Sequence, residues 1–562
     1  MKEKKYGGYI SKLKFNDDSE LKLNKNDIVL FVGPNNAGKS QSIKDIFSLC
    51  EKKRDNIVIK DIEVTKYDGD ISELLESIAK VINNGNYKSY LLLGRNYDLF
   101  SHGLRSFMNN EYFNNFRDLF VANLDTTARL IISEPTNNIA LNDPKTNPIH
   151  CAAYSREYRE WLSDNFKKAF GTSLIPNTNY GAIIPLCMGE PVKLEGPFPD
   201  EQFRQEEYRK ILSEYKQVQN QGDGIKSFTG ILLYLMLKHY CIYCIDEPES
   251  FLHPPQAKII GQIIGKTLSI NQQAFISTHS ESFINGILES NPNRVKIIRI
   301  TREEDNNTFA ILNNDKIKDI WNDPLLRHSN IMSSLFYKTV VLCESDSDCK
   351  FYSIVEEYLK EQSGSYSETL FIHCGGKHRI PKILKALHSL NIDIKTIVDL
   401  DILNDEKLVK ELTAEQKISW DEISSDYNIL ISNINSSKQH IKRDDVKLKI
   451  NSILDNKKSP ELDTKELNEI ENMISVPSVW KEIKKAGVSA LPSGDAKKAF
   501  NKINDLFKQN SIHIVPVGEL EGFIKEVGNH GPEWVNSVLE NYPSFNDNVY
   551  DEVKKFISEI NL

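Results

Sequence analysis

Apolar residues follow two patterns along this chain. Between residues 9 and 32 they first alternate with polar residues and then, after Asp27, form a continuous run at 28–32, which predicts a hairpin leading into a buried strand at 27–32. Similar short apolar runs predict further strands at 241–245, 273–278, 295–300, 339–343, 370–374, 392–398 and 511–517. Helical spacing predicts helices at 41–49 and 228–240. Strands that alternate with helices in this way predict an α/β protein.

Two long stretches do not follow this order. The first, residues 51–220, combines a strand-like run at 56–64, a helical run at 71–82, an apolar run from Tyr90 and a helix-rich, aromatic-rich part at 99–171. No heptad pattern persists there, which excludes the long coiled-coil arm of chromosome-maintenance ATPases. We therefore expect a first domain at 1–335 with a helical insert at about 90–205, which would serve as an oligomerisation module or as a clamp.

The second stretch, residues 405–510, is rich in Lys, Asp, Glu, Asn and Ser at helical spacing. It predicts a helical insertion at about 406–510 within a second domain at 336–562. Its lysines would suit contacts with a DNA backbone, but charged helix faces are more often simply solvated, so both interpretations stay open.

A phosphate-binding motif follows the first buried strand. Residues 33–40 read Gly-Pro-Asn-Asn-Ala-Gly-Lys-Ser and match G-x-x-x-x-G-K-[ST] at every fixed position, between a strand and a helix. The glycines let backbone N–H groups surround phosphates, while the lysine reaches the β and γ oxygens and the serine can ligate Mg²⁺. The predicted nucleotide-binding residues are Gly33, Asn35, Asn36, Gly38, Lys39, Ser40 and Gln41. The sequence therefore predicts an ATP site.

Acidic residues follow the next two strands in the way such a site requires. One strand ends in Asp246-Glu247-Pro248-Glu249, and the following one ends in His279. In phosphate-loop ATPases such an acid pair supplies a carboxylate to the Mg²⁺ shell, here Asp246, and a neighbour that polarises the attacking water, here Glu247. A lone histidine is more often structural than catalytic, but its place after this acid pair favours a catalytic role for His279.

A second set of acids lies at the ends of later predicted strands. These residues are Glu344 with Asp348, Asp399 with Asp401, and Glu519 with Glu521. Carboxylate oxygens on adjacent strand ends suit one or two Mg²⁺ or Mn²⁺ ions held against a phosphodiester. Gly375-Gly376, at another strand end, permits close backbone approach. A solvated strand end explains any one pair equally well, but the whole set in this order favours a metal site.

Composition narrows the class of protein. The 562 residues allow about three to four domains, and 40% apolar with 27% charged residues is typical of a globular protein. No apolar run reaches the roughly 18 residues that span a bilayer, and residues 1–5 lack the apolar core of a signal peptide, so we expect a cytoplasmic protein without a membrane partner. Cys241 and Cys244 have no second pair and sit in an apolar run, which predicts buried thiols and not zinc. A net charge of −9 argues against a surface that is basic throughout, as nucleic-acid binding would favour, but it permits a local basic groove or contact through metal ions.

The N-terminal motifs resemble the ATPase head of ABC-type and recombination-associated (SMC, RecF-like) proteins. The resemblance rests on the phosphate-binding loop, the turn Gly222-Asp223-Gly224, the acidic segment from Asp246 and the segment around His279. On its own the glycine turn is weak evidence. In those families a nucleotide lies between two heads, which implies that Gly222, Gly224 and Ser227 act on the partner's nucleotide, that His279 senses the γ-phosphate, and that the chain is at least a dimer.

The C-terminal acids resemble the toprim domain of topoisomerases, primases and some nucleases, and the order of all the motifs resembles the OLD (overcoming lysogenisation defect) family of nucleases. The family pattern implies two metals at Glu344, Asp348, Asp399, Asp401 and Glu521, with Glu519 as a neighbour. It also implies a transition-state lysine beyond the last acid, for which Lys525, His530, Lys554 and Lys555 all remain open. Without one, cutting would be slow, dependent on a partner or confined to unusual substrates.

The resemblance implies an ATP-binding, metal-dependent DNA endonuclease or nickase that assembles through its ATPase heads. It further implies a role in anti-phage defence, beside a helicase or a reverse transcriptase. A first alternative is a recombination-type DNA-binding ATPase whose toprim site is an inactive scaffold. A second is an RNA-cutting toprim enzyme, although the sequence has no recognisable RNA-binding module. A transporter ATPase is disfavoured because it would not require the C-terminal acids.

Overall fold

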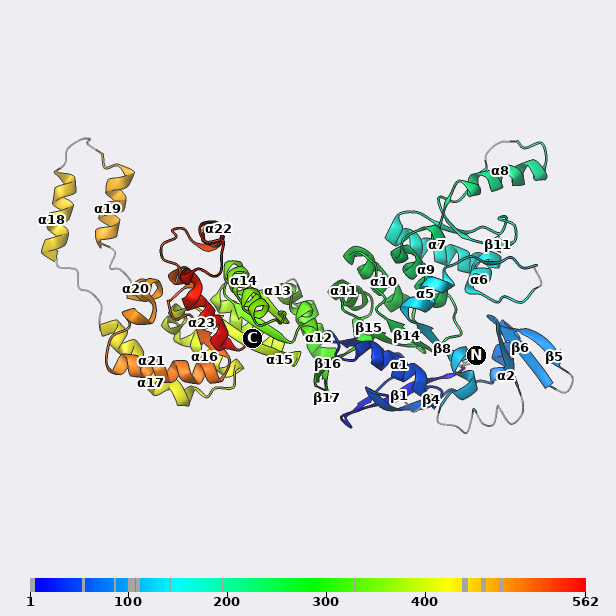
Figure 1. Ribbon diagram of the computed structural model, residues 1–562, viewed down its shortest axis with the longest axis horizontal. Coiled ribbons are helices and arrows are strands. Elements are labelled where there is room, and N and C mark those ends of the chain that lie inside the picture. The colour runs from blue at the N-terminus through cyan, green and yellow to red at the C-terminus, as the bar shows by residue number, and fades with distance from the viewer. Residues whose placement is uncertain are drawn as a thin grey trace. The chain divides into compact units, whose positions relative to one another are not determined.

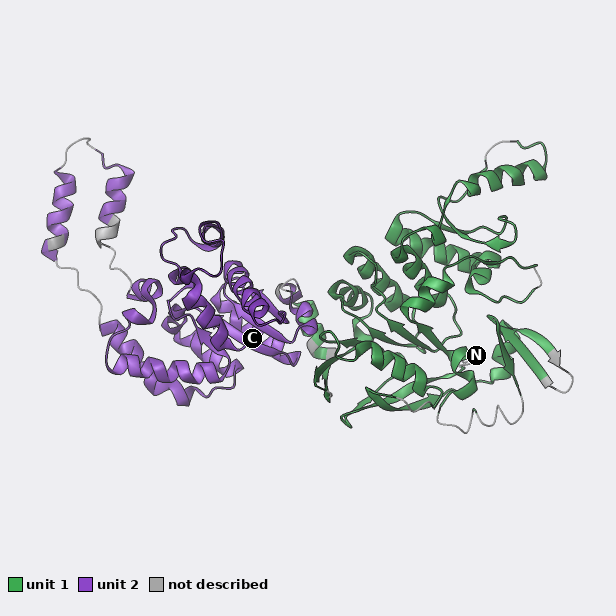
Figure 2. Cartoon of the chain, viewed as in Figure 1, with its two compact units in different colours: residues 1–323 green, residues 324–562 purple. Residues whose placement is uncertain are grey.

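The computed structural model divides the chain into two compact units, residues 1–323 and 324–562 (Figure 2). It describes residues 6–52, 56–84, 87–99, 107, 112–140, 143–194, 197–304, 306–312, 314–327, 330–436, 443–455, 461–474 and 479–562. The predicted boundary lies at 335/336, whereas residues 324–335 group with the second unit because the 3₁₀ helix Ile331–Phe336 packs against α15 (Ile380–Ser389). The α/β class is confirmed for both units.

A six-stranded sheet forms the centre of the first unit, in the order β17-β16-β3-β15-β14-β8 (Figure 1). Its strands are β3 (Ile28–Val32), β8 (Val121–Leu124), β14 (Ile242–Asp246), β15 (Gln273–Ser277), β16 (Val295–Glu303) and β17 (Asn306–Leu312). All neighbours pair in parallel except β16 and β17. Every residue of β3 and β15 is buried, as continuous apolar runs in a sheet covered on both faces should be. The carboxyl ends of β3, β14 and β15 therefore meet at one edge.

Smaller sheets flank this centre. The predicted N-terminal hairpin is confirmed, since β1 (Gly8–Phe15) pairs antiparallel with β2 (Glu20–Lys22), while β4 (Ile59–Lys66) pairs with the other edge of β1. The helix predicted at 71–82 is only partly right. Helix α2 (Ile71–Ile78) gives way to β5 (Lys80–Asn84), because the β-branched Val81 and Ile82 pair with β6 (Tyr87–Leu92). The edge strand β7 (Arg95–Asp98) completes that sheet.

The stretch predicted as an insert at about 90–205 is not one separate module. It contains β8, which pairs with β14 in the central sheet. The helices of this stretch and of the following part of the unit are α4 (Arg117–Phe120), α5 (Thr126–Ile132), α6 (Pro148–Tyr154), α7 (Arg156–Phe170), α8 (Glu201–Ser213), α9 (Asp223–Leu235), α10 (Pro254–Thr267), α11 (Glu281–Ser290) and α12 (Asn314–Asn322). Short strands accompany them at β9 (Thr136–Asn137), β10 (Leu174–Pro176), β11 (Ile183–Ile184), β12 (Leu186–Met188) and β13 (Lys216–Gln217). Cys241 and Cys244 are buried thiols, as predicted.

The second unit contains a four-stranded parallel sheet in the order β19-β18-β20-β21. Its strands are β18 (Thr339–Cys343), β19 (Thr369–His373), β20 (Asp393–Val398) and β21 (Ile512–Ile514). Helices α14 (Asp346–Gln362), α22 (Gly531–Asn541) and α23 (Asp551–Ile560) pack together around the rings of Phe351, Trp534 and Tyr550. The centroids of Phe351 and Trp534 lie 5.0 Å apart in an edge-to-face arrangement, a favourable geometry for buried rings.

The chain between β20 and β21 is helical, as the charged pattern predicts. Its helices are α16 (Glu406–Glu415), α17 (Trp420–Ser436), α18 (Arg443–Leu454), α19 (Thr464–Ile474), α20 (Val479–Ala486) and α21 (Asp495–Gln509). Helices α17 and α21 pack along one another, whereas α18 and α19 form a pair that projects from the unit (Figure 1). Across the described part of the chain, no helix has both the length and the apolar character needed to cross a bilayer.

Candidate nucleotide site and candidate metal centre

The phosphate-binding loop joins β3 to α1 (Lys39–Leu49). Gly33 has a φ of 143°, and a Cβ at this position would lie 2.0 Å from the carbonyl oxygen of Ile300, so only glycine fits there. Gly38 caps α1 in a left-handed conformation. Lys39 is only 4% exposed, and its Nζ donates hydrogen bonds to the carbonyls of Gly33 at 2.9 Å and Pro34 at 2.6 Å. The loop therefore holds an ammonium group at the N-terminus of a helix, where phosphates bind.

The remaining predicted loop residues lie around this point. Asn35 and Asn36 are exposed, and Asn36 has a left-handed φ of 58°. Ser40 and Gln41 are half-buried in the first turn of α1, and the Gln41 amide donates to Asp45 at 2.7 Å. Ser40 thus supplies a hydroxyl in the first turn of α1, next to Lys39.

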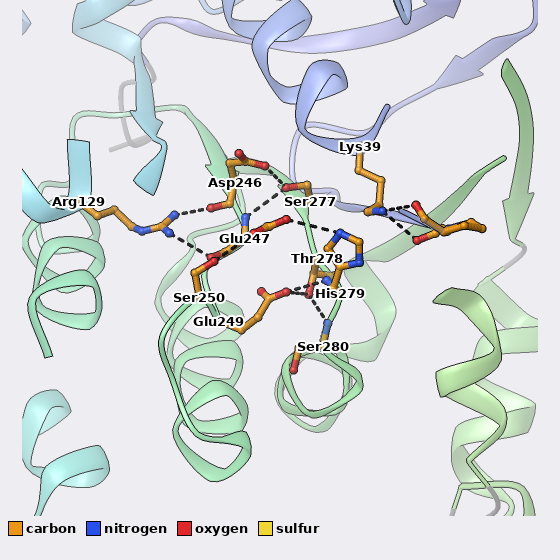
Figure 3. A network of polar contacts seen from close by, with 12 residues as sticks. Lys39, Arg129, Asp246, Glu247, Glu249, Ser250, Ser277, Thr278, His279 and Ser280 are labelled. Atoms are coloured by element: carbon orange, nitrogen blue, oxygen red, sulfur yellow. Dashed lines mark hydrogen bonds and ion pairs between the residues drawn. The ribbon is translucent and has the colours of Figure 1, made fainter. Parts of the chain in front are cut away.

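The carboxyl ends of β14 and β15 face this loop (Figure 3). The Ser277 hydroxyl donates to the Asp246 carboxylate, and the backbone N–H of Glu247 donates to the Ser277 carbonyl at 3.1 Å. His279 Nε2 lies 3.5 Å from Glu247 Oε1. Burial lowers the pKa of Lys39 to about 8, although the negative charges of Glu247, Glu249 and Asp246 raise it. The lysine and these three acids therefore interact electrostatically. The structure thus brings together Lys39, Asp246, Glu247 and His279 as the sequence predicts.

Glu249 connects the acidic segment to the histidine segment, a role that the sequence does not reveal. Its Oε1 accepts hydrogen bonds from the Thr278 hydroxyl at 2.8 Å and from the His279 backbone N–H at 2.7 Å. Its Oε2 is buried without a hydrogen-bond partner. Burial raises the pKa of this carboxyl to about 7, and the hydrogen bonds from His279 and Thr278 only partly oppose that rise.

Replacing Glu249 with glutamine should remove a pH dependence of stability. Because the folded pKa is about 7 and the ordinary value is 4.5, the folded protein holds this proton more tightly than the unfolded chain does. The resulting stabilisation, at most roughly 3 kcal/mol, is complete below about pH 4.5 and is lost as the pH rises through 7. Urea unfolding of nucleotide-free and metal-free protein at pH 5 and pH 8 measures the difference between wild type and Glu249→Gln. Identical pH dependence in both proteins would contradict the assignment.

Arg129, on α5, lies beside the acidic segment (Figure 3), and its side chain is fully buried. Its guanidinium donates to the carbonyls of Asp246 and Glu247, the latter at 3.1 Å, and to the Ser227 hydroxyl at 3.0 Å. It also donates to the Leu124 carbonyl at 2.8 Å. One side chain therefore fixes the acidic turn and α9 together. The sequence offers no signal for it, because a single arginine in an irregular stretch matches no motif.

Replacing Arg129 with methionine should destabilise the protein by about 3 kcal/mol or more, since several buried oxygens would lose their only charged donor. Arg156→Met is the matched control, because Arg156 lies on the surface and pairs with Glu160, also on the surface, at 2.7 Å. That control should cost less than about 1 kcal/mol. Denaturant unfolding measures both, and equal stability of the two variants would contradict the role described for Arg129.

The glycine turn and Ser227 lie at the start of α9. Gly222 caps this helix with open space beside its Cα, whereas a Cβ on Gly224 would lie 2.4 Å from the carbonyl oxygen of Phe251. Ser227 is fully buried and accepts the hydrogen bond from Arg129. Within one chain, Gly222 is thus the most accessible of the three residues, and the Ser227 hydroxyl is engaged internally.

In the second unit, parallel pairing brings the predicted acids together. Glu344 follows β18, while Asp399 and Asp401 follow the neighbouring β20. One carboxylate oxygen from each of these three residues lies within 4.8 Å of the others. The backbone N–H of Asp399 also donates to Glu344 Oε1 at 3.2 Å. Three convergent carboxylates are a ligand set for a hard divalent cation.

A second cluster forms after β21. Oxygen or nitrogen atoms of Glu519, Glu521 and His530 lie within 4.8 Å of one another. Glu521 Oε1 accepts a hydrogen bond from the Gly531 backbone N–H at 2.8 Å and lies 3.3 Å from His530 Nδ1. The structure therefore groups five of the six predicted acids into two clusters, and it adds His530 to the second.

Asp348 has a local role in addition. It forms a capping box with Ser345 at the start of α14, because its carboxylate accepts the Ser345 backbone N–H at 2.8 Å. Burial raises the pKa of this carboxyl, and the charge of Glu521 adds to the rise. Asp348 is therefore close enough to the second cluster to sense it, although it is not a member of either compact ligand set among the described residues.

The electrostatics of the centre fit a divalent metal. Burial, followed by the charge of Asp401, raises the pKa of Glu344, and burial, followed by the charge of Glu344, raises the pKa of Asp399 well above its ordinary value. Asp401 Oδ1 is buried and has no hydrogen-bond partner. Carboxylates that cannot all ionise together, with one oxygen left over, are the donor set that a cation would complete. Glu344, Asp399 and Asp401 would hold it.

Two lysines that no sequence motif marks pair with the acids of this centre. Lys377, directly after Gly375-Gly376, lies 2.8 Å from Asp401 Oδ2. Lys484, on α20, lies 3.0 Å from Asp399 Oδ2 and 3.6 Å from Glu519 Oε2.

Two backbone features hold the Lys377 loop in place. Both glycines have positive φ, and the Gly376 N–H donates to the Glu344 carbonyl at 2.9 Å. The predicted close backbone approach thus serves to seat the loop that carries Lys377.

The positions considered for a lysine after the last acid lie elsewhere, apart from His530. Lys525 and Lys555 are exposed, and Lys554 lies 3.3 Å from Asp551 on its own helix. His530 is beside Glu521 at the rim of the centre. Among the described residues, the ammonium groups that pair with these acids, those of Lys377 and Lys484, therefore precede Glu519 in the sequence.

Comparisons with known proteins agree with the two units. The family described as "AAA domain, putative AbiEii toxin, Type IV TA system" matches residues 28–285, and the "Overcoming lysogenization defect protein-like, TOPRIM domain" family matches residues 335–401. The latter match includes Glu344 and ends at Asp401, so Lys484, Glu519 and Glu521 lie beyond it.

Individual relatives are distant. The Old nuclease of Escherichia phage P2 is 21% identical over 328 residues, which cover 56% of this chain and 49% of the phage protein, so the chain spans about half the length of that relative. An SMC head domain of Thermotoga maritima is 12% identical at a TM-score of 0.29, covering 54% of this chain and 99% of its own. An Smc head domain bound to ScpA derived from Pyrococcus furiosus is 13% identical at a TM-score of 0.32, covering 56% and 99%.

Proposed function

Since the chain joins an ATPase domain of the AAA and ABC/SMC-like kind to a toprim domain of the overcoming-lysogenisation-defect kind, we propose that it is an ATP-binding, divalent-metal-dependent DNA endonuclease or nickase. The observation that carries this proposal is the cluster of Glu344, Asp399 and Asp401 within 4.8 Å, with a buried carboxylate oxygen of Asp401 left unpaired. Nucleotide state regulates this centre, and the protein acts in the cytoplasm.

The acids bind and orient the reacting groups. A divalent cation supplies charge neutralisation of the phosphodiester and a hydroxide nucleophile when it is bound. Glu344, Asp399 and Asp401 would hold one divalent cation, and Glu519, Glu521 and His530 would hold a second. Asp348 supports the second position electrostatically while it caps α14. The substrate phosphate then lies between the two clusters.

In the ATPase unit, Lys39 and the loop backbone bind the phosphates, and Ser40 and Asp246 would hold Mg²⁺. Glu247 orients the attacking water, and His279, 3.5 Å from it, faces the γ-phosphate. Gly222, open beside α9, contacts the nucleotide of a second copy, which makes the protein a homodimer or a higher homo-oligomer through its heads and the 90–205 stretch. The resemblance to OLD nucleases further supports a role in anti-phage defence beside a helicase or a reverse transcriptase.

Incubation of the full-length protein with supercoiled plasmid tests this function. Mg²⁺ or Mn²⁺ should produce nicked or linear DNA, EDTA should stop the reaction, and the double variant Asp399→Ala/Asp401→Ala should be inactive. A matched RNA of the same sequence should remain intact. Cleavage that survives the double variant, or wild-type protein that cuts under no nucleotide condition, would refute the nuclease.

One observation favours a second candidate, a DNA-binding ATPase with an inactive toprim scaffold. Lys377 and Lys484 already pair with Asp401 and Asp399, and such pairs would stabilise acids that bind no metal. Direct titration with Mn²⁺ separates the candidates, since a scaffold held by lysines should bind none at the Asp399 cluster.

A further inference from the structure

Lys484 lies where the two acidic clusters meet. Its Nζ is 3.0 Å from Asp399 Oδ2 and 3.9 Å from Asp401 Oδ2 in the first cluster, and 3.6 Å from Glu519 Oε2 in the second. Lys377, by contrast, pairs with Asp401 of the first cluster. Lys484 is thus the one ammonium group in the described part of the chain that bridges both halves of the centre.

Helix α20 presents this lysine specifically. Trp480 and Ile483 are buried and anchor the helix, while Lys481 and Lys485 point to solvent. The Lys484 side chain is 32% exposed, so its ammonium group is partly open to solvent while it contacts the acids. A charged helix that merely coated the surface would not turn one of its three lysines into an acidic centre.

The backbone fixes α20 against the loop that carries Glu519. Gly518 has a φ of 101°, and a Cβ there would lie 2.0 Å from the Lys484 carbonyl oxygen. Its own carbonyl accepts the Leu400 backbone N–H at 3.0 Å, next to Asp399. Gly487 likewise leaves no space, since a Cβ would lie 2.4 Å from the Pro516 carbonyl oxygen. These close contacts require glycine at positions 487 and 518, and the tight backbone packing there fixes the position of Lys484.

We propose that Lys484 is a catalytic residue of the toprim centre, and that its ammonium group binds the scissile phosphate between the two clusters. This inference rests on the proposed nuclease function. In the reaction a water oxygen bonds to phosphorus as the bond from phosphorus to the 3′ oxygen breaks, and the protons of water end on the 3′-hydroxyl and, through solvent, on the 5′-phosphate group or bulk water. Lys484 transfers no proton and stabilises the added negative charge on the phosphoryl oxygens.

The alternative is that Lys484 only holds the acids apart. The two roles predict different metal binding. An ammonium group this close to the ligand carboxylates repels a divalent cation, so Lys484→Met should bind Mn²⁺ with a dissociation constant that is unchanged or lower by up to about tenfold. If Lys484 instead only positioned the carboxylates, its replacement would weaken Mn²⁺ binding.

The test compares Lys484→Met, Lys484→Arg and the matched control Lys485→Met in the full-length protein. Mn²⁺ binding is followed by electron paramagnetic resonance, and plasmid cleavage is measured in single turnover at saturating Mn²⁺. We expect cleavage by Lys484→Met to fall about 100-fold with Mn²⁺ binding retained, Lys484→Arg to recover part of the rate, and Lys485→Met to match wild type.

Cleavage by Lys484→Met within about threefold of wild type would overturn the proposal, as would loss of Mn²⁺ binding in that variant. Faster cleavage by Lys484→Met at low Mn²⁺ would also overturn it, because the lysine would then act only as a competitor of the metal. A wild-type protein that binds Mn²⁺ but never cuts would instead refute the proposed function itself, so the two failures are distinct.

Discussion

Replacing Asp399 with asparagine is expected to abolish metal-dependent DNA cleavage and, at the same time, to raise the melting temperature of the metal-free protein. Cleavage should fall about 1000-fold, since the loss of a metal ligand removes several kcal/mol of transition-state stabilisation. The gain in stability follows from electrostatics. Burial and the neighbouring charge of Glu344 raise the pKa of Asp399 well above its ordinary value, and the charge of Lys484 only partly opposes that rise, so an ionised carboxylate is unfavourable there without a metal ion.

Initial rates of plasmid nicking with Mg²⁺ and thermal unfolding in EDTA at pH 8 measure the two effects on the same preparation. Asp421→Asn is the control, because Asp421 is exposed at the start of α17 and carries the same change in charge. The opposite signs make the experiment informative, since a misfolded variant would lose both activity and stability. If the Asp399→Asn protein were fully active, the proposed metal centre would have no part in DNA cleavage.

Replacing Lys39 with alanine is expected to weaken ATP binding by at least about 100-fold. The buried ammonium group lies inside the phosphate-binding loop, where it contacts two loop carbonyls, and charge-assisted hydrogen bonds to phosphate contribute about 3 kcal/mol. Alanine lacks both the positive charge and most of the aliphatic chain of lysine.

Lys44→Ala is the matched control, because Lys44 lies on the same helix and is exposed. Binding of a fluorescent ATP analogue should be normal for Lys44→Ala and nearly absent for Lys39→Ala. Comparable affinity in the two variants would place the nucleotide elsewhere. Circular dichroism of both variants separates a loss of binding from a loss of folding.

Local pattern was sufficient for most of the fold. Short apolar runs ending in acids predicted β14, β18 and β20, because a buried strand and a polar strand end differ sharply in residue type. The pattern failed at β8, which lies in a stretch that also contains helices and was assigned to the insert. Its four residues join the central sheet only through β14, and no local feature records that long-range pairing.

The acids of the candidate centre were predictable and its cations were not. Glu344, Asp399 and Asp401 each follow a strand, so parallel pairing alone brings them to one edge. Lys484 reaches the same place through helix packing and two close glycine contacts, in a segment where many lysines have the same local pattern. Arg129 poses the same difficulty, because its partners are mainly carbonyl groups that every sequence contains.

Because α17 packs along α21, the acidic centre should not depend on the length of the chain between α17 and α20. Tyr427 on α17 donates to the Leu403 carbonyl at 2.8 Å, close after Asp401, and α21 leads directly into β21 and Glu519. The two helices form a closed stem, so the chain between α17 and α20 can lengthen or shorten without changing the distance from Asp401 to Glu519. Changes in the length of the chain around α18 and α19 should therefore leave Asp401 and Glu519 in place, and an affinity tag or fluorophore placed between these two helices should leave the chemistry intact.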